Sequence, residues 1–102
     1  MNAEQIRTIS KRKYLHQLAK LANKENHEAQ LLITVNGGTF RITPELIAFL
    51  AVPDLPITIY LLDTYENPVE LDRKEFLASC IERYNTVMQS WWDANEQINK
   101  QR

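Results

Sequence analysis

The chain has 102 residues, of which 44% are hydrophobic, and its formal net charge is −1. This length predicts a single domain spanning residues 1–102, and the composition excludes a chain that is disordered throughout. The small net charge argues against general affinity for nucleic acid or membranes, but the charge is unevenly distributed. Residues 1–24 carry six basic residues and one acidic residue, whereas the other 78 residues carry six basic and twelve acidic residues.

Cysteine content and hydropathy limit the compartment in which the protein is expected. Cys80 is the single cysteine, so an intrachain disulfide and a cysteine-based zinc site are both excluded. This usage is typical of a reducing compartment. The N-terminus lacks an apolar run of signal-peptide length, and no 18-residue apolar stretch occurs in the chain. We therefore expect a soluble cytoplasmic protein without a membrane span.

Residues 3–24 have the apolar spacing of a first helix. Ile6 and Ile9, and then Tyr14, Leu18 and Leu21, recur at steps of three and four residues. The polar run at residues 10–13 interrupts this pattern and leaves two alternatives. Either the helix is continuous and has a basic flank, or residues 1–10 form a loose basic arm. The polar stretch at residues 23–30 is expected to end the helix.

Residues 30–43 predict a β-hairpin, because apolar residues alternate on both sides of Asn36-Gly37, a strong signal for a two-residue turn. Thr43-Pro44-Glu45 then predicts the start of a short helix. Threonine is a good N-cap, proline suits the first helical position, and an acidic side chain suits the helix N-terminus. Pro53 closes this element.

Residues 57–71 predict a second hairpin, with a turn at residues 65–68. Apolar residues on both faces of the first strand favour a central strand covered on both sides. Pro68 at the start of the return strand favours an edge position. The expected fold is therefore α+β: a two-layer sandwich of one four-stranded antiparallel sheet, made from two hairpins, with the order α-β-β-α-β-β-α.

Residues 72–102 predict a long C-terminal helix, because Asp72 and Glu75 form a capping-box pattern and no glycine or proline follows. Its main apolar residues lie seven apart: Leu77, Tyr84, Trp91 and Ile98. Such a helix spans roughly 40 Å. We expect its first half to pack in the core, with Cys80 as a packing residue, and its second half to extend beyond the domain.

Catalytic chemistry finds little support in the sequence. His16 and His27 have no neighbouring nucleophile, and Cys80 lies on an apolar seam. The acidic residues of the second hairpin lack the spacing of a calcium loop. We therefore predict a non-enzymatic protein with no cofactor and no metal site.

The second half of the long helix is the expected partner-binding site, because tryptophan is over-represented at interaction hot spots. A homodimer through this helix is the simplest form, and another protein is the alternative partner. The predicted contact residues are Tyr84, Val87, Met88, Trp91, Trp92 and Ile98.

The basic N-terminal segment supports a second hypothesis, a nucleic-acid-associated regulator that contacts phosphates. Its candidate residues are Arg7, Lys11, Arg12 and Lys13. A simpler alternative is that these residues form a solvated flank that pairs with acidic residues of the same chain.

The segment Tyr60-Leu61-Leu62-Asp63-Thr64-Tyr65-Glu66-Asn67-Pro68-Val69-Glu70-Leu71-Asp72, followed by a final helix rich in Tyr and Trp, resembles small accessory proteins of tailed bacteriophages. The resemblance covers about the last 45 residues of the sequence. It implies a role in assembly or host interaction, and the host cytoplasm as the location if the protein is viral. No functional residue is carried over from it.

Overall fold

The computed structural model describes residues 2–100 and has the predicted order of elements, α-β-β-α-β-β-α. The seven elements are α1 (Ala3–Gln30), β1 (Leu32–Val35), β2 (Gly38–Arg41), α2 (Pro44–Leu50), β3 (Thr58–Leu62), β4 (Pro68–Asp72) and α3 (Arg73–Lys100).

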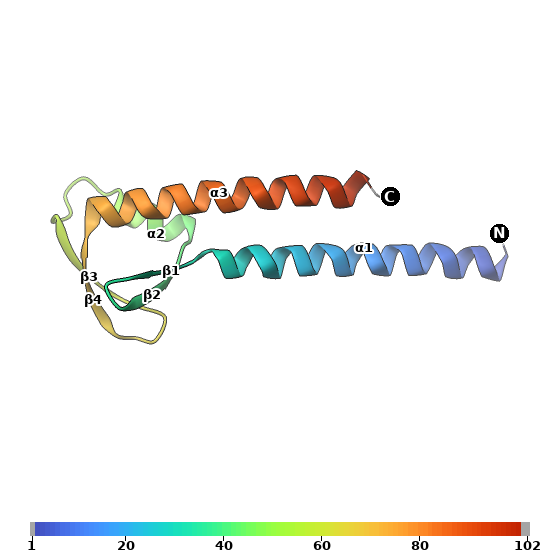
Figure 1. Ribbon diagram of the computed structural model, residues 1–102, viewed down its shortest axis with the longest axis horizontal. Helices are drawn as coiled ribbons and strands as arrows, with labels where there is room; N and C mark the ends of the chain where they lie inside the picture. The colour runs from blue at the N-terminus through green and yellow to red at the C-terminus, as the bar shows by residue number, and fades with distance from the viewer. Residues whose placement is uncertain (1, 101–102) are drawn as a thin grey trace.

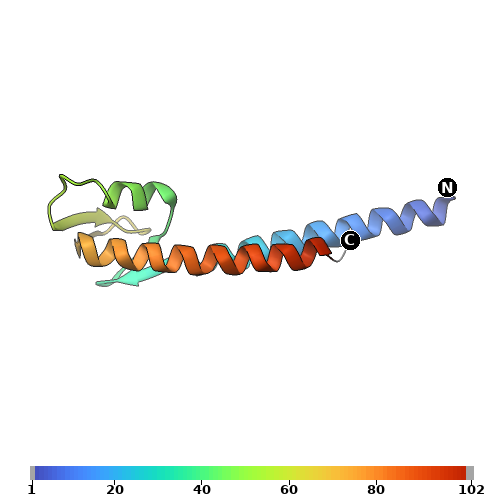
Figure 2. The ribbon, with the colours of Figure 1, turned by 90° about the horizontal axis from the view of Figure 1, so that it is seen from above.

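The molecule is elongated and consists of a stalk and a head (Figure 1). The stalk is the antiparallel pair of long helices α1 and α3, and the head is the group of α2 and the four strands at one end of it. The described residues extend over 66 × 24 × 18 Å, with a radius of gyration of 19.5 Å. A compact domain of this length has a radius of about 13 Å. The N-terminal turns of α1 protrude beyond the described end of α3 (Figure 2).

The predicted four-stranded sheet is wrong. Strands β1 and β2 form one antiparallel hairpin, β3 and β4 form another, and no ladder joins the two within residues 2–100. The hairpins meet instead through isolated contacts. The amide of Thr64 donates to the carbonyl of Thr39 at 2.9 Å, and the Asn36 side chain donates to the carbonyl of Glu70 at 2.8 Å.

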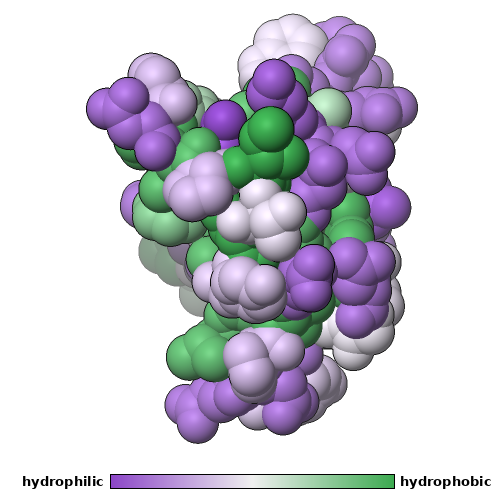
Figure 3. Space-filling view, turned by 90° about the vertical axis from the view of Figure 1, so that its left-hand side faces the viewer, coloured by the Kyte–Doolittle hydropathy of each residue, from purple (hydrophilic) through white to green (hydrophobic). Residues whose placement is uncertain are grey.

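Strand β3 is not a covered central strand, which corrects a second expectation. Ile59 points into the core, but Tyr60 and Leu62 on the opposite face are exposed. A two-stranded hairpin packed on one side leaves its other face to solvent. Figure 3 views the end of the head and shows apolar surface, in green, lying among polar side chains.

The predicted turn at Asn36-Gly37 and the predicted N-caps Thr43 and Asp72 are confirmed. Asn36 and Gly37 both have positive φ, 51° and 81°, as a tight two-residue hairpin turn requires. The Thr43 side chain accepts from the Leu46 amide at 3.1 Å and starts α2. The Asp72 carboxylate accepts from the Glu75 amide at 3.0 Å and starts α3.

The hydrophobic core lies in the head and includes the first half of α3, as expected. Phe40 and Phe76 pack edge to face with ring centroids 5.1 Å apart. Cys80 is fully buried, and burial raises the pKa of its thiol to about 11, so the thiol is neutral at physiological pH. The core residues are Leu31, Phe40, Ile42, Leu50, Ile59, Val69, Leu71, Phe76, Cys80 and Val87.

Helix α1 is longer than predicted, because the polar stretch at residues 23–30 does not end it. His27 in this stretch is buried against α3, and the Arg83 guanidinium donates to the carbonyl of Gln30 at 3.2 Å. These contacts from α3 hold the last turns of α1 in helical form. At the other end Asn2 and Gln5 form a capping box, so the structure has the continuous helix rather than the loose arm.

Candidate functional site

Most of the α3 residues predicted to bind a partner are at least partly buried within the single chain. Val87 belongs to the core, and Tyr84 packs against that core. Met88, Trp91 and Ile98 are partly buried. Trp92 differs from these residues, because 63% of its surface is exposed. In this conformation Trp92 is therefore the residue of that set most accessible to another molecule.

Trp91 and His27 fix the contact between the two stalk helices. Their rings stack with centroids 5.9 Å apart and an interplanar angle of 14°. Nδ1 of His27 lies 2.7 Å from the carbonyl of Asn23, which can only accept, so Nδ1 carries the proton. In the neutral ring, Nε2 then accepts from the Ser90 hydroxyl at 3.2 Å. This set of contacts defines which side of α1 faces α3.

The side of α1 that faces α3 is mainly polar. His16, Lys20, Asn23 and His27 follow one another at steps of three and four residues and therefore lie on one helix face. His27 is buried and the other three are partly buried, unlike most of the helix. Apolar residues of α1 contribute less to this side: Ile9, Leu15 and Ala19 line a groove with Ile98 of α3, and of these three only Ala19 is partly buried.

Four large side chains of α1 form an exposed stripe centred on its other side. Tyr14, Leu15, Leu18 and Leu21, here called the outer stripe, are between 43% and 60% exposed. Their spacing of three and four residues gathers them on a single face. The sequence showed this spacing but did not show which side of the helix would face solvent. No sequence signal separates a stripe that faces the core from one that faces solvent.

The four basic candidates on α1 are all exposed, and they lie toward its protruding end: Arg7, Lys11, Arg12 and Lys13. The ion pairs among residues 2–100 join Lys24 to Glu28 and Arg41 to Glu28, so neither includes these four. They also lie at the opposite end of the stalk from the acidic head.

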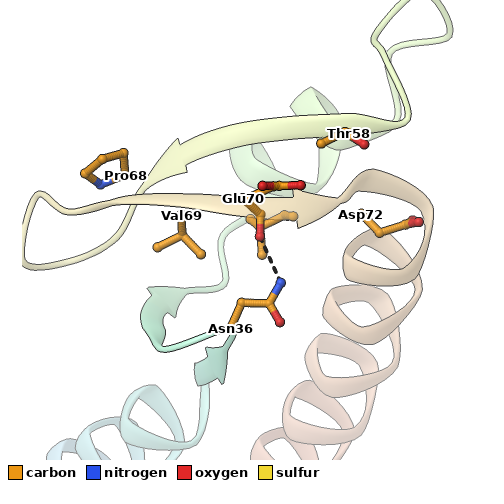
Figure 4. A pocket seen from close by; sticks show the side chains of 7 residues that line it. Asn36, Thr58, Pro68, Val69, Glu70 and Asp72 are labelled. Atoms are coloured by element: carbon orange, nitrogen blue, oxygen red, sulfur yellow. Dashed lines mark hydrogen bonds between the residues drawn. The ribbon is translucent and has the colours of Figure 1, made fainter.

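The head has a shallow groove of about 540 Å³ beside strand β4 (Figure 4). Asn36 and Glu70 lie on its wall and are joined by the hydrogen bond described above. The groove also exposes the carboxylate of Asp72. No cluster of three or more metal-ligating side chains occurs in the described part of the chain. The groove thus offers two exposed carboxylates and strand backbone, but no arrangement of nucleophile and base.

Asp63 has a structural role at the junction of the two hairpins. One oxygen of its carboxylate accepts from the amides of Asn67 and Tyr65, each at 2.9 Å, and the other accepts from the amide of Thr39 at 3.3 Å. Backbone donors, first that of Asn67, hold the pKa of Asp63 below its ordinary value of 3.8. Three of its acceptor positions are therefore already occupied by this chain.

Neither helix hydropathy nor comparison with known proteins indicates a function for the chain. No helix among residues 2–100 combines the length and hydropathy needed to cross a membrane. No protein-family model matches the chain, and no curated protein or solved structure is significantly similar to it. The outer stripe, Trp92 and the basic end of α1 are accordingly the features from which a function is inferred.

Proposed function

We propose that this protein is a small binding module without catalytic activity that self-associates through its helical stalk. The observation that carries this proposal is the outer stripe, whose four large side chains are between 43% and 60% exposed. The stripe is centred on the side of α1 away from α3, although Leu15 at its edge also lines a groove with Ile98. Contiguous exposed apolar patches on soluble proteins commonly mark interaction sites. A second copy is the simplest partner, because two-fold dimers are the commonest oligomers.

The length and shape of the stalk suit self-association. Both helices have 28 residues and thus span roughly 42 Å, which gives a long and straight surface for lateral packing. The exposed Trp92 lies on α3, outside the outer stripe, and is a separate candidate contact of the kind enriched at interaction hot spots. The resemblance to phage accessory proteins supports a role for such self-association in assembly or host interaction.

Analytical ultracentrifugation of the pure protein tests the proposal. We expect a concentration-dependent shift from monomer to dimer across the micromolar range. A strict monomer throughout that range would contradict self-association and leave only a foreign partner.

The two tryptophans provide a matched pair of variants for the same experiment. Trp92→Ala should leave both assembly and the fold nearly unchanged, because Trp92 is exposed on α3 and lies outside the outer stripe. Trp91→Ala should lower the free energy of unfolding instead, because Trp91 stacks on buried His27. Equal effects of both substitutions on assembly and stability would argue against this division.

Nucleic-acid contact through α1 is the second candidate function. Its supporting observation is the exposure of Arg7, Lys11, Arg12 and Lys13 without an ion pair to another described residue. Phosphate contacts of this kind give binding that weakens steeply with salt. The variant in which Lys11, Arg12 and Lys13 become alanine should lose salt-sensitive binding to duplex DNA or RNA. Unchanged binding by that variant would remove this candidate.

A further inference from the structure

The face of α1 that contains the outer stripe has an internal symmetry centred on Leu18. Leu15 and Leu21 lie three residues to either side of it, and Tyr14 and Ala22 lie four residues to either side. Charged residues bound this apolar region, Lys11 seven residues before Leu18 and Glu25 seven residues after it. A seven-residue step is close to two full helical turns, so all these positions share one face.

The charges at the two ends of this face are opposite in sign, and this asymmetry determines how two copies can pair. In a parallel pair, Lys11 would lie beside the partner's Lys11 and Glu25 beside the partner's Glu25. In an antiparallel pair, each Lys11 would lie beside the partner's Glu25. Opposite charges on facing helices select partner and orientation, whereas like charges oppose pairing.

We infer that two copies associate through this face with their α1 helices antiparallel and the two-fold axis at Leu18. This inference rests on the proposed self-association and adds the orientation and register of the interface. The two Leu18 side chains meet at the axis, Leu15 packs beside the partner's Leu21, and Tyr14 packs over the partner's Ala22. Lys11 and Glu25 close the interface at both ends.

The structure leaves these groups available for such a contact. Lys11, Ala22 and Glu25 are exposed, as is the outer stripe. Lys11 and Glu25 take part in neither ion pair of residues 2–100. The side of α1 bound to α3 is the opposite one, so the dimer forms without disturbing the His27 contacts with Ser90 and Trp91.

In the same register, the protruding end of α1 lies against the partner. Ile6 lies opposite the partner's Gln30, because each is twelve residues from Leu18. The two helices therefore overlap from residue 6 to residue 30, over roughly 37 Å. The N-terminal turns of each copy then reach the base of the partner's head. Residues 1–24 carry six basic residues and one acidic residue, whereas residues 31–72 carry one basic and six acidic residues, so the two segments are complementary in charge.

Thiol cross-linking tests the orientation directly. Cys80 is the single cysteine and is fully buried, so an engineered surface cysteine supplies the accessible thiol. Lys11→Cys and Glu25→Cys proteins, mixed and treated with a short bis-maleimide, should give a cross-linked heterodimer. Each variant alone should give almost none. Efficient cross-linking of Lys11→Cys to itself would overturn the antiparallel arrangement.

Wild-type ultracentrifugation separates failure of this inference from failure of the proposed function. A wild-type dimer whose mixed variants do not cross-link refutes the register, while self-association stands. A wild-type monomer refutes self-association, and the register with it.

Charge reversal provides an independent test in the same dimer. Lys11→Glu should raise the dissociation constant about three- to thirtyfold, because two exposed ion pairs are lost. The double variant Lys11→Glu/Glu25→Lys should restore wild-type affinity, since both pairs reform with exchanged signs. Lys13→Glu is the matched control, because it makes the same charge change on another side of the helix and should have a smaller effect. A double variant that binds no better than Lys11→Glu would overturn the pairing.

Discussion

Substitution of Leu18 by glutamine tests the outer stripe at its centre. Leu18 is 43% exposed in the single chain, and complete burial of a leucine side chain stabilises by about 1.5–3 kcal/mol. The fraction still exposed thus corresponds to about 0.6–1.3 kcal/mol per copy. In the proposed dimer two copies of Leu18 meet at the two-fold axis, so the expected loss per dimer is about 1.3–2.6 kcal/mol. The dissociation constant should therefore rise about ten- to seventyfold.

The isolated chain should tolerate this change. Glutamine has nearly the helix propensity of leucine, and a substitution at an exposed site usually alters the free energy of unfolding by less than about 0.5 kcal/mol. Sedimentation equilibrium gives the dissociation constant, and urea unfolding below that concentration gives the stability of the monomer. Leu62→Gln is the matched control, since Leu62 is 64% exposed but lies on the outer face of β3.

The dissociation constants and the unfolding free energies together can refute the proposed interface. If Leu18→Gln and Leu62→Gln dimerise equally well, the outer stripe is not the interface. If Leu18→Gln instead lowers the free energy of unfolding by several kcal/mol, Leu18 is a packing residue of the single chain.

Three further predictions concern the head. A Cβ at Gly38 would lie 2.5 Å from Cγ2 of Val69. Gly38→Ala should therefore lower the free energy of unfolding in urea by about 1–3 kcal/mol. An unchanged urea midpoint would show that the two hairpins can move apart at this point without cost. Glu66 has a φ of 63°, so Glu66→Gly should stabilise by about 0.5–1 kcal/mol, and a lower unfolding midpoint would contradict left-handed strain at this turn. Burial raises the pKa of the Cys80 thiol from 9.0 to about 11, so the folded state favours the neutral thiol more than the unfolded state does. The free energy of unfolding should therefore fall as the pH rises above 9, where the unfolded chain begins to lose this proton. Between pH 9 and 11 the wild type should lose about 1.4 kcal/mol per pH unit relative to Cys80→Ala, and parallel pH profiles for the two proteins would refute that coupling.

Local features of the fold were predictable because short-range chemistry determines them. The turn at Asn36-Gly37 needs positive φ, which glycine adopts freely and asparagine tolerates. The caps Thr43 and Asp72 satisfy amides only three residues away. Such interactions depend on a few neighbouring residues, so the sequence alone locates them.

The arrangement of the two hairpins depends on contacts that the sequence pattern does not encode. The carboxylate of Asp63 binds amides of its own turn and also the amide of Thr39 in the other hairpin. This junction and the close approach of Gly38 to Val69 hold the two hairpins together. The strands of one hairpin nevertheless form no ladder with those of the other. Alternating apolar residues predict each hairpin but cannot distinguish a shared sheet from two hairpins packed through their side chains.

The candidate site was predictable in kind but not in place. The sequence indicated a long helix with more apolar surface than its domain could cover, and assigned that excess to α3. In the structure Val87 is buried and Met88, Trp91 and Ile98 of α3 are partly buried, whereas the large side chains of the outer stripe on α1 are exposed. Apolar periodicity identifies a stripe, but long-range packing decides which of two facing helices leaves its stripe exposed.

The rotational setting of α1 is the physical basis of the proposed association through its exposed stripe. Half a turn of α1 about its axis would bring Leu18 and its neighbours against α3 and bury them within one chain. That turn would also break the contacts of His27 with Ser90 and Trp91 and carry the buried His27 ring into solvent. Pairing of two chains through Leu18 buries the same apolar side chains while every His27 contact is kept. The proposed antiparallel dimer would therefore keep the polar contacts of α1 and bury its apolar stripe together.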